Sequence, residues 1–222
     1  MVANIAPVSV KLLVTLHTPQ DADRVRATGV KVLADYPDTL LVRATPAERQ
    51  LLQAQKLEAV ELEHPPVQVA GASFAFYSAL EAEQTAPAPE APPDRTAYYL
   101  VRMVGPAKGE WLERVRALGG TVHADLPGFS LLVGLLPSRL NELRQEPWVE
   151  GVTPYRATMK VAGALRPGAP RVLDAAHLTA FAGAPAGAQQ VEISVFRGES
   201  TADIAAKVRT NHGVALGKRT TP

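Results

Sequence analysis

The sequence predicts an α+β fold made of a βαββαβ unit that occurs twice in full and once in part. Residues 25–37 (VRATGVKVLADYP) align with residues 115–127 (VRALGGTVHADLP), and a shorter match lies at residues 207–216 (KVRTNHGVAL). Strand-length apolar runs and helical patterns also follow one another in the same order in both complete units. The repeated order of elements therefore defines the fold class.

The first complete unit contains strands and helices with clear start and stop signals. Its predicted strands are short apolar or β-rich runs at residues 8–17, 30–36, 40–44 and 58–62. The first helix begins after Thr18, with Pro19 at the first helical position and Asp21 at the third, which is a capping box. Gly29 ends this helix. The same capping pattern at Thr45 begins the second helix.

The second complete unit follows the same plan. Its predicted strands lie at residues 97–104, 121–126, 130–135 and 149–153. In its first helix, an apolar stripe suited to lying on a sheet is formed by Trp111, Leu112, Val115 and Leu118. Gly119 ends that helix. Leu140 and Leu143 belong to the second helix.

Two βαβ crossovers of the usual right hand give this order of elements a ferredoxin-like arrangement, with both helices on one face of a four-stranded antiparallel sheet. The predicted segments are a first unit at 8–71, a Pro/Ala/Glu-rich linker at 72–96, a second unit at 97–163, a second linker at 164–190 and an incomplete third unit at 191–222. In this topology the third strand separates the first two. We therefore expect the third unit to be a truncation, or to be completed by another chain or by further sequence.

Composition excludes several function classes. The chain has 222 residues, 23 basic against 22 acidic, and no cysteine. Disulfides, thiolate zinc sites and cysteine nucleophiles are thereby excluded, whereas the compartment stays open. The near-zero net charge gives no general attraction to nucleic acid or an anionic membrane. We expect no membrane span and see no signal-peptide pattern at the N-terminus of this chain.

No motif predicts catalysis, a metal or a cofactor. The histidines are spread along the chain with no pair at metal-ligand spacing, at His17, His64, His123, His177 and His212. No serine lies in a G-x-S-x-G motif. Residues 105–109 (GPAKG) resemble a phosphate loop, but they lack the terminal Gly-Lys-Ser/Thr and contain a proline where a backbone donor is needed. We interpret them as a strand-to-helix turn.

Small ferredoxin-like modules can bind RNA or sense amino acids. An RNA-binding sheet displays aromatic residues on its central strands, whereas these central strands are aliphatic, so we expect no nucleic-acid partner. An amino-acid sensor would use the equivalent strand-to-helix turns at residues 18–20 and 105–108. The favoured interpretation of both turns is that they cap helices.

Particular phrases of the sequence suggest a family. They are LLVTLHTPQDADRVRATGVKVLADYPDTLLVRATPAE followed by VAGASFAF in the first unit and, most specific of all, YYLVRMVGPAKGEWLERVRALGG with LRQEPWVEGVTPY in the second. This succession, with the Pro/Glu linker, resembles the N-terminal region of large secreted subtilisin-like serine peptidases and covers most of the chain. The peptidase's Asp-Thr-Gly, His-Gly-Thr-His and Gly-Thr-Ser-Met-Ala motifs are absent. The resemblance therefore implies a pro-region or accessory module that is not itself an enzyme.

The resemblance also implies a mode of action and a location. Pro-regions of this family are ferredoxin-like modules that assist folding of the protease and inhibit it through the sheet face and the segment after the last strand. By resemblance, the contact segment is residues 66–71 or residues 157–163, which gives as contact residues either Pro66, Val67, Gln68 and Val69 or Ala157, Thr158, Met159 and Lys160. The implied partner is a subtilisin-like protease domain, in cis or in trans, in an extracellular location. The alternatives are a structural protein that self-associates by strand addition through residues 191–222, and the amino-acid sensor.

Overall fold

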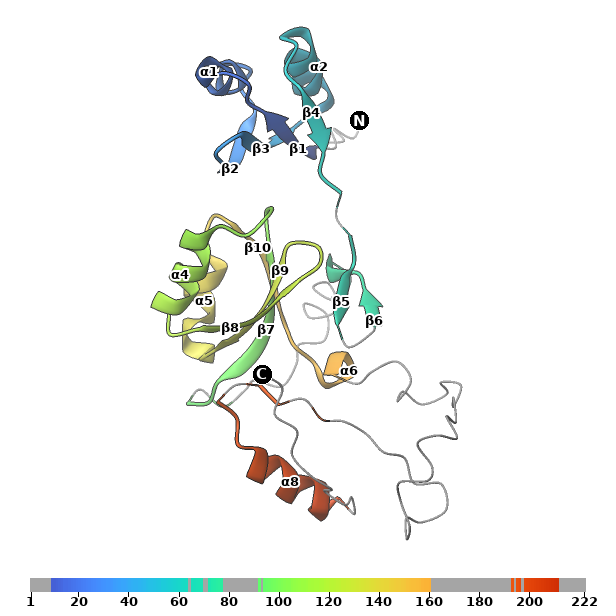
Figure 1. Cartoon of the computed structure of the whole chain (residues 1–222), viewed down its shortest axis with the longest axis vertical. Coiled ribbons are helices and arrows are strands. Elements are labelled where there is room, and N and C mark those ends of the chain that lie inside the picture. Colours follow the sequence, from blue (N-terminus) through green and yellow to red (C-terminus); the bar gives the residue numbers. More distant parts are fainter. Residues whose placement is uncertain are drawn as a thin grey trace, which may run out of the picture. The chain divides into compact units, whose positions relative to one another are not determined.

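The computed structural model describes residues 9–63, 65–69, 72–77, 92, 94–160, 193, 195–196 and 198–211 (Figure 1). The chain divides into two compact units, Met1–Pro170 and Arg171–Pro222, which are described separately. Within the described ranges no helix is both long enough and apolar enough to cross a membrane.

The first module of the unit Met1–Pro170 is an antiparallel four-stranded sheet with two helices. Its elements are β1 (Val10–Thr15), α1 (Pro19–Ala27), β2 (Lys31–Asp35), β3 (Thr39–Ala44), α2 (Pro46–Ala54) and β4 (Ala59–Glu61). The strand order is β2-β3-β1-β4. The helices cover one face, where Leu12 and Val14 of β1 and Leu40 of β3 pack with Val25 and Leu52. The opposite face carries the alternate residues of the same strands.

Both helices of this module begin at the predicted capping boxes. The Asp21 carboxylate accepts a hydrogen bond from the Thr18 backbone N–H at 2.8 Å. In α2, the Glu48 carboxylate accepts from the Thr45 backbone N–H at 2.6 Å, while the Thr45 hydroxyl accepts from the Glu48 N–H at 3.3 Å. These bonds satisfy backbone donors that a helix start otherwise leaves unpaired.

The second module repeats the order of elements. It comprises β7 (Ala97–Met103), α4 (Gly109–Ala117), β8 (Thr121–Leu126), β9 (Ser130–Leu135), the 3₁₀ turn η1 (Pro137–Arg139), α5 (Leu140–Arg144) and β10 (Val149–Pro154). The strand order is β10-β7-β9-β8, again antiparallel. The α+β class and the predicted strands of both complete units are thus confirmed.

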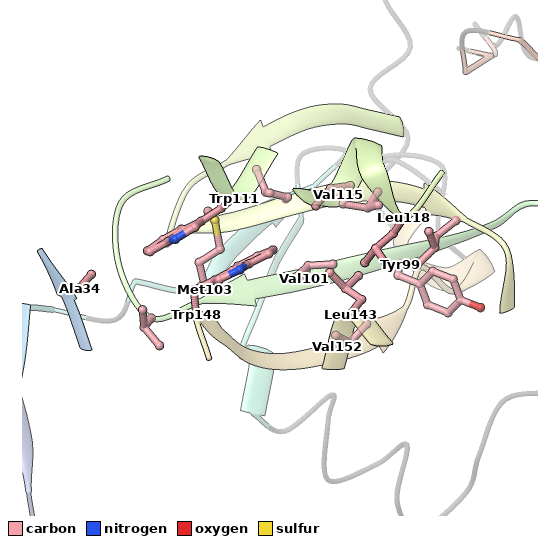
Figure 2. Packing of buried hydrophobic residues seen from close by; sticks show 14 of the residues in the cluster. Ala34, Tyr99, Val101, Met103, Trp111, Val115, Leu118, Leu143, Trp148 and Val152 are labelled. Atoms are coloured by element: carbon pink, nitrogen blue, oxygen red, sulfur yellow. The ribbon is translucent and has the colours of Figure 1, made fainter. Parts of the chain in front are cut away.

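The core of the second module lies between its sheet and its helices. Val101 and Met103 of β7 pack against Trp111 and Val115 of α4 (Figure 2). The indole ring of Trp111 stacks on that of Trp148, with ring centroids 5.5 Å apart and an interplanar angle of 6°. The predicted apolar stripe of α4 therefore faces the sheet.

The structure differs from the sequence prediction where the linker was expected to begin. Residue 72 is the first residue of β6 (Ala72–Phe74), which pairs antiparallel with β5 (Val67–Val69). Val67 lies opposite Phe74, and Val69 lies opposite Ala72. We call the described residues 65–69 and 72–77 the hairpin segment. Of the expected linker, residues 78–91 and 93 lie outside the described part of the chain.

The unit Arg171–Pro222 contains helix α8 (Thr201–Thr210), whose first turn is capped by the Ser200 hydroxyl accepting from the Asp203 N–H at 3.2 Å. The described residues of the preceding apolar run, Ile193, Val195 and Phe196, are not in a strand. The partial third unit is therefore present only as its helix among the described residues. The predicted linker at 164–190 and the histidine His212 lie outside them.

Candidate functional site

The strongest candidate site is the face of the second sheet opposite α4 and α5. Leu100 and Arg102 of β7 lie on this face, opposite Leu132 and Ser130 of β9. One face of an antiparallel sheet can remain in contact with water. Here, however, Leu100 is 0 % exposed, Leu132 5 % and Arg102 1 %. This face is therefore covered.

The hairpin segment lies over this face (Figure 1). Its residues Val67, Val69 and Phe76 are buried. The Pro65 carbonyl accepts a hydrogen bond from Arg102 Nη1 at 3.3 Å, and the Phe76 ring lies 5.9 Å from the Arg102 guanidinium carbon. The chain thus uses its own residues to cover a sheet face that could contact another protein.

Half of the predicted contact residues belong to this hairpin segment. Val67 and Val69 are buried, and Pro66 is exposed. Gln68 pairs through its backbone with Ser73. In this conformation, therefore, the two valines are turned toward the chain itself and do not form an outer contact surface.

The other half forms helix α6 (Ala157–Lys160), which follows β10. The Tyr155 N–H donates to the Tyr98 carbonyl at 2.8 Å, and the Lys160 ammonium lies 5.8 Å from the Tyr98 ring centroid and 5.5 Å from that of Tyr155. Met159 is partly buried. Tyr98 alternates with Leu100 and Arg102 along β7, so its side chain lies on the same sheet face. The structure therefore brings both predicted contact segments to one face.

The positive charge of Arg102 is buried under the hairpin segment and has few compensating contacts. Among the described residues its Nε has no hydrogen-bond partner. Burial lowers the pKa of Arg102, while Tyr77 and Glu150 act in the opposite direction. An arginine side chain stays charged in proteins, so the buried charge cannot be removed by deprotonation.

Thr153 is a second unsatisfied polar residue on this face. It is fully buried on β10, opposite Leu100. Within the described part of the chain its hydroxyl has no hydrogen-bond partner. A buried polar group without a partner is costly, so the covered face is not fully matched by its cover.

Beside this face, a cluster of charged residues joins the two modules. Glu150 occupies a bulge in β10, because the pairing with β7 shifts register between Val149 and Gly151. Lys11 of β1 donates to Glu150 Oε2 at 2.7 Å and to the Val104 carbonyl at 3.0 Å. Arg43 of β3 reaches the other carboxylate oxygen at 3.4 Å.

Burial governs the acid–base behaviour of this cluster. It lowers the pKa of Lys11, and the hydrogen bond to Glu150 partly opposes that effect. Burial, followed by hydrogen bonding to Glu150, raises the pKa of Tyr77. A cavity of about 310 Å³ adjoins the cluster and is lined by Ser9, Val10, Lys11, Arg43, Glu61, Leu62, Tyr77 and Glu150.

The predicted strand-to-helix turn at residues 105–108 is confirmed and contacts the first module. A Cβ added at Gly105 would lie 2.6 Å from Leu41 Cδ2, so only glycine fits without movement. The Tyr36 hydroxyl donates to the Pro106 carbonyl at 2.8 Å, and burial raises the pKa of Tyr36 to about 12. The Lys108 ammonium lies 5.9 Å from the Tyr36 ring centroid.

Sequence reasoning did not single out Lys11, Tyr77, Arg102 or Glu150. Lys11 and Arg102 each interrupt an apolar strand, and this was the available signal. A charged side chain in such a run is rarely buried without a partner. The bulge that places Glu150, by contrast, has no comparable mark in the sequence.

Other candidate chemistry is limited in the described ranges. They contain no group of three or more His, Asp or Glu that could hold a metal ion. His17 lies 3.3 Å from the Glu58 carboxylate, and the His123 ring lies 5.4 Å from that of Tyr98. Comparisons with family models, curated proteins and solved structures found no match to this chain.

Proposed function

We propose that the chain is a non-catalytic pro-region or accessory module of a subtilisin-like serine protease, built from two ferredoxin-like modules and acting by protein–protein contact. In each module the strand order is fourth, first, third, second, which is the order of a ferredoxin-like sheet. The proposal further depends on the sequence of the strand, the turn and the tryptophan-bearing helix in the second unit, which resembles the N-terminal region of subtilisin-like serine peptidases.

One observation carries the proposal. The two alternative contact segments, at β5 and at α6, both lie against the same face of the second sheet. In this conformation β5 covers that face, whereas α6 presents the exposed Lys160 beside it, so α6 is the accessible contact segment. The second module is therefore the proposed inhibitory module, and the first module supports it through the Lys11–Glu150 junction.

Inhibition and folding assistance test the proposal directly. The purified chain is mixed at micromolar concentration with active subtilisin, and separately with denatured subtilisin, and peptide hydrolysis is followed. We expect slower hydrolysis in the first mixture or greater recovery of activity in the second. Absence of both effects rejects the proposed function.

A pair of matched variants locates the contact. Met159→Asp places a carboxylate on α6, and we expect it to weaken inhibition at least about tenfold, since a charge buried at an interface is unfavourable. Leu51→Asp places the same charge on the exposed surface of α2 and should leave inhibition unchanged. Equal effects of the two substitutions would show that α6 is not the contact.

A further inference from the structure

We propose that the sheet face carrying Leu100, Arg102 and Thr153 is a protein-binding surface that the hairpin segment covers reversibly, and that the partner which displaces this segment brings a carboxylate to Arg102. The inference deepens the proposed function and depends on it in one respect, namely that the partner is a protein. The hairpin segment then regulates access to this face, and the partner must carry an aspartate or a glutamate.

The cover is small. β5 and β6 pair over only three residue positions, from Val67–Phe74 to Val69–Ala72. A two-stranded hairpin is marginally stable by itself in water, so this one depends on the packing of Val67, Val69 and Phe76. Removal of a few apolar contacts is therefore sufficient to release it.

The cover also leaves polar groups of the sheet unsatisfied. Arg102 Nε and the Thr153 hydroxyl have no hydrogen-bond partner among the described residues. The Arg102 guanidinium donates a hydrogen bond to the Pro65 carbonyl at 3.3 Å and lies over the Phe76 ring. In the described ranges it forms no ion pair with a carboxylate. The Glu150 carboxylate is instead bound by Lys11 at 2.7 Å.

These features define the chemistry of a better occupant. Apolar side chains of a partner would only replace the buried Val67 and Phe76 like for like. A carboxylate would supply what the hairpin segment lacks, since a charge-assisted, bidentate pair with arginine is stronger than a single bond to a carbonyl. The partner is therefore an apolar protein segment with an aspartate or glutamate among its apolar residues.

Hydrogen exchange of the intact chain tests whether the cover is reversible. We expect the amides of β5 and β6 to exchange together and at least about a hundredfold faster than those of β7, because the hairpin opens without unfolding of the sheet. Exchange of the hairpin amides as slowly as those of β7 overturns the inference.

Peptide binding tests the carboxylate. The full-length double variant Val67→Ser/Phe76→Ala releases the cover, and its fold is checked by the fluorescence of Trp111 and Trp148 on the opposite sheet face. If this variant unfolds, Val69→Ser alone is used. The probes are synthetic peptides of residues 65–77 that carry Phe76→Glu or Phe76→Gln, because the Phe76 ring lies against the Arg102 guanidinium. We expect a Glu peptide to bind at least about tenfold more tightly than its Gln counterpart, and Arg102→Met to abolish the difference. Equal binding of both kinds of peptide overturns the carboxylate requirement.

Inhibition of subtilisin separates this inference from the proposed function. If wild type inhibits, the released variant should inhibit more strongly, and equal inhibition overturns the regulatory role of the hairpin segment. If neither protein inhibits, the proposed function fails. The exchange measurement still decides whether the cover is reversible, and the peptide measurement still decides whether the partner needs a carboxylate.

Discussion

The Lys11 ammonium lies 2.7 Å from the Glu150 carboxylate, which joins the first strand of the first module to the bulge of β10 in the second. Both side chains are largely removed from water, at 5 % and 12 % exposure. Glu150 also contacts Arg43 and influences Tyr77, which belongs to the hairpin segment. One carboxylate therefore connects both modules with the cover of the proposed binding face.

Replacement of this carboxylate should be costly. Glu150→Gln keeps the shape of the side chain but leaves the buried Lys11 ammonium without its counter-charge. Loss of one partner of a buried pair typically destabilises by about 3–5 kcal/mol, and we expect a value near the lower end because Lys11 keeps the Val104 carbonyl. Urea denaturation measures the free energy of unfolding.

A matched control is available on the surface. Glu61 forms an ion pair with Arg49 at 3.1 Å, and both side chains are exposed. Glu61→Gln should change the free energy of unfolding by less than about 1 kcal/mol. Similar values for the two substitutions would contradict a structural role for the Lys11–Glu150 pair.

Two glycines give a test of the contact between the modules. Gly105→Ala should destabilise by about 1–3 kcal/mol, because the added methyl group would meet Leu41 Cδ2 at 2.6 Å. Gly109→Ala adds the same atom at the start of α4, where nothing lies within 4 Å, and should be neutral or stabilising by about 0.4–1 kcal/mol. Thermal unfolding of both variants checks the difference. Equal melting temperatures would show that Leu41 does not pack against Gly105 in solution.

The capping carboxylates predict a pH dependence in acid. Backbone hydrogen bonds, first of all from Thr18, lower the pKa of Asp21 below its usual 3.8. The Thr45 backbone N–H likewise lowers the pKa of Glu48 below 4.5. Because these pKa values are lower in the folded state than in the unfolded state, the unfolded chain binds more protons in acid. The stabilisation is therefore present above the unfolded pKa values and is lost as the pH falls through the folded ones.

The measurement is urea denaturation of wild type and of Asp21→Asn/Glu48→Gln between about pH 6 and pH 3. Neutral amides still accept the cap hydrogen bonds but do not titrate. The variant should therefore lose less stability than wild type over this range. Parallel curves for the two proteins would show that other carboxylates cause the acid sensitivity.

The sequence allowed the elements of both modules to be predicted, because their signals are local. The capping boxes at Thr18 and Thr45 and the apolar stripe at Trp111 depend on residues within one or two turns. Local patterns predict that a linker begins at residue 72 because β5 and β6 are short, and Val67 and Val69 become buried only against a sheet formed by later residues. The hairpin is stabilised by contacts with residues that are distant in the sequence, and local sequence patterns do not show such contacts.

The candidate site was predictable only in outline. The resemblance indicated the two contact segments, but it did not indicate that one of them covers the sheet face. Arg102 stands among apolar residues in AYYLVRM, and its burial without a carboxylate depends on which segment lies above it. Glu150 is placed by a break in the β-ladder register, which sequence periodicity does not show.

Replacement of Arg102 should change stability and binding in opposite directions. Arg102→Met should raise the free energy of unfolding by about 1–4 kcal/mol, because it removes a buried, poorly compensated charge and keeps an apolar side chain of similar length. The same substitution should weaken binding of a carboxylate-bearing partner. Arg116→Met, at an exposed position near the end of α4, is the control and should change stability little. Destabilisation by Arg102→Met would show that the guanidinium is well satisfied in solution, and the requirement for a carboxylate would then be withdrawn.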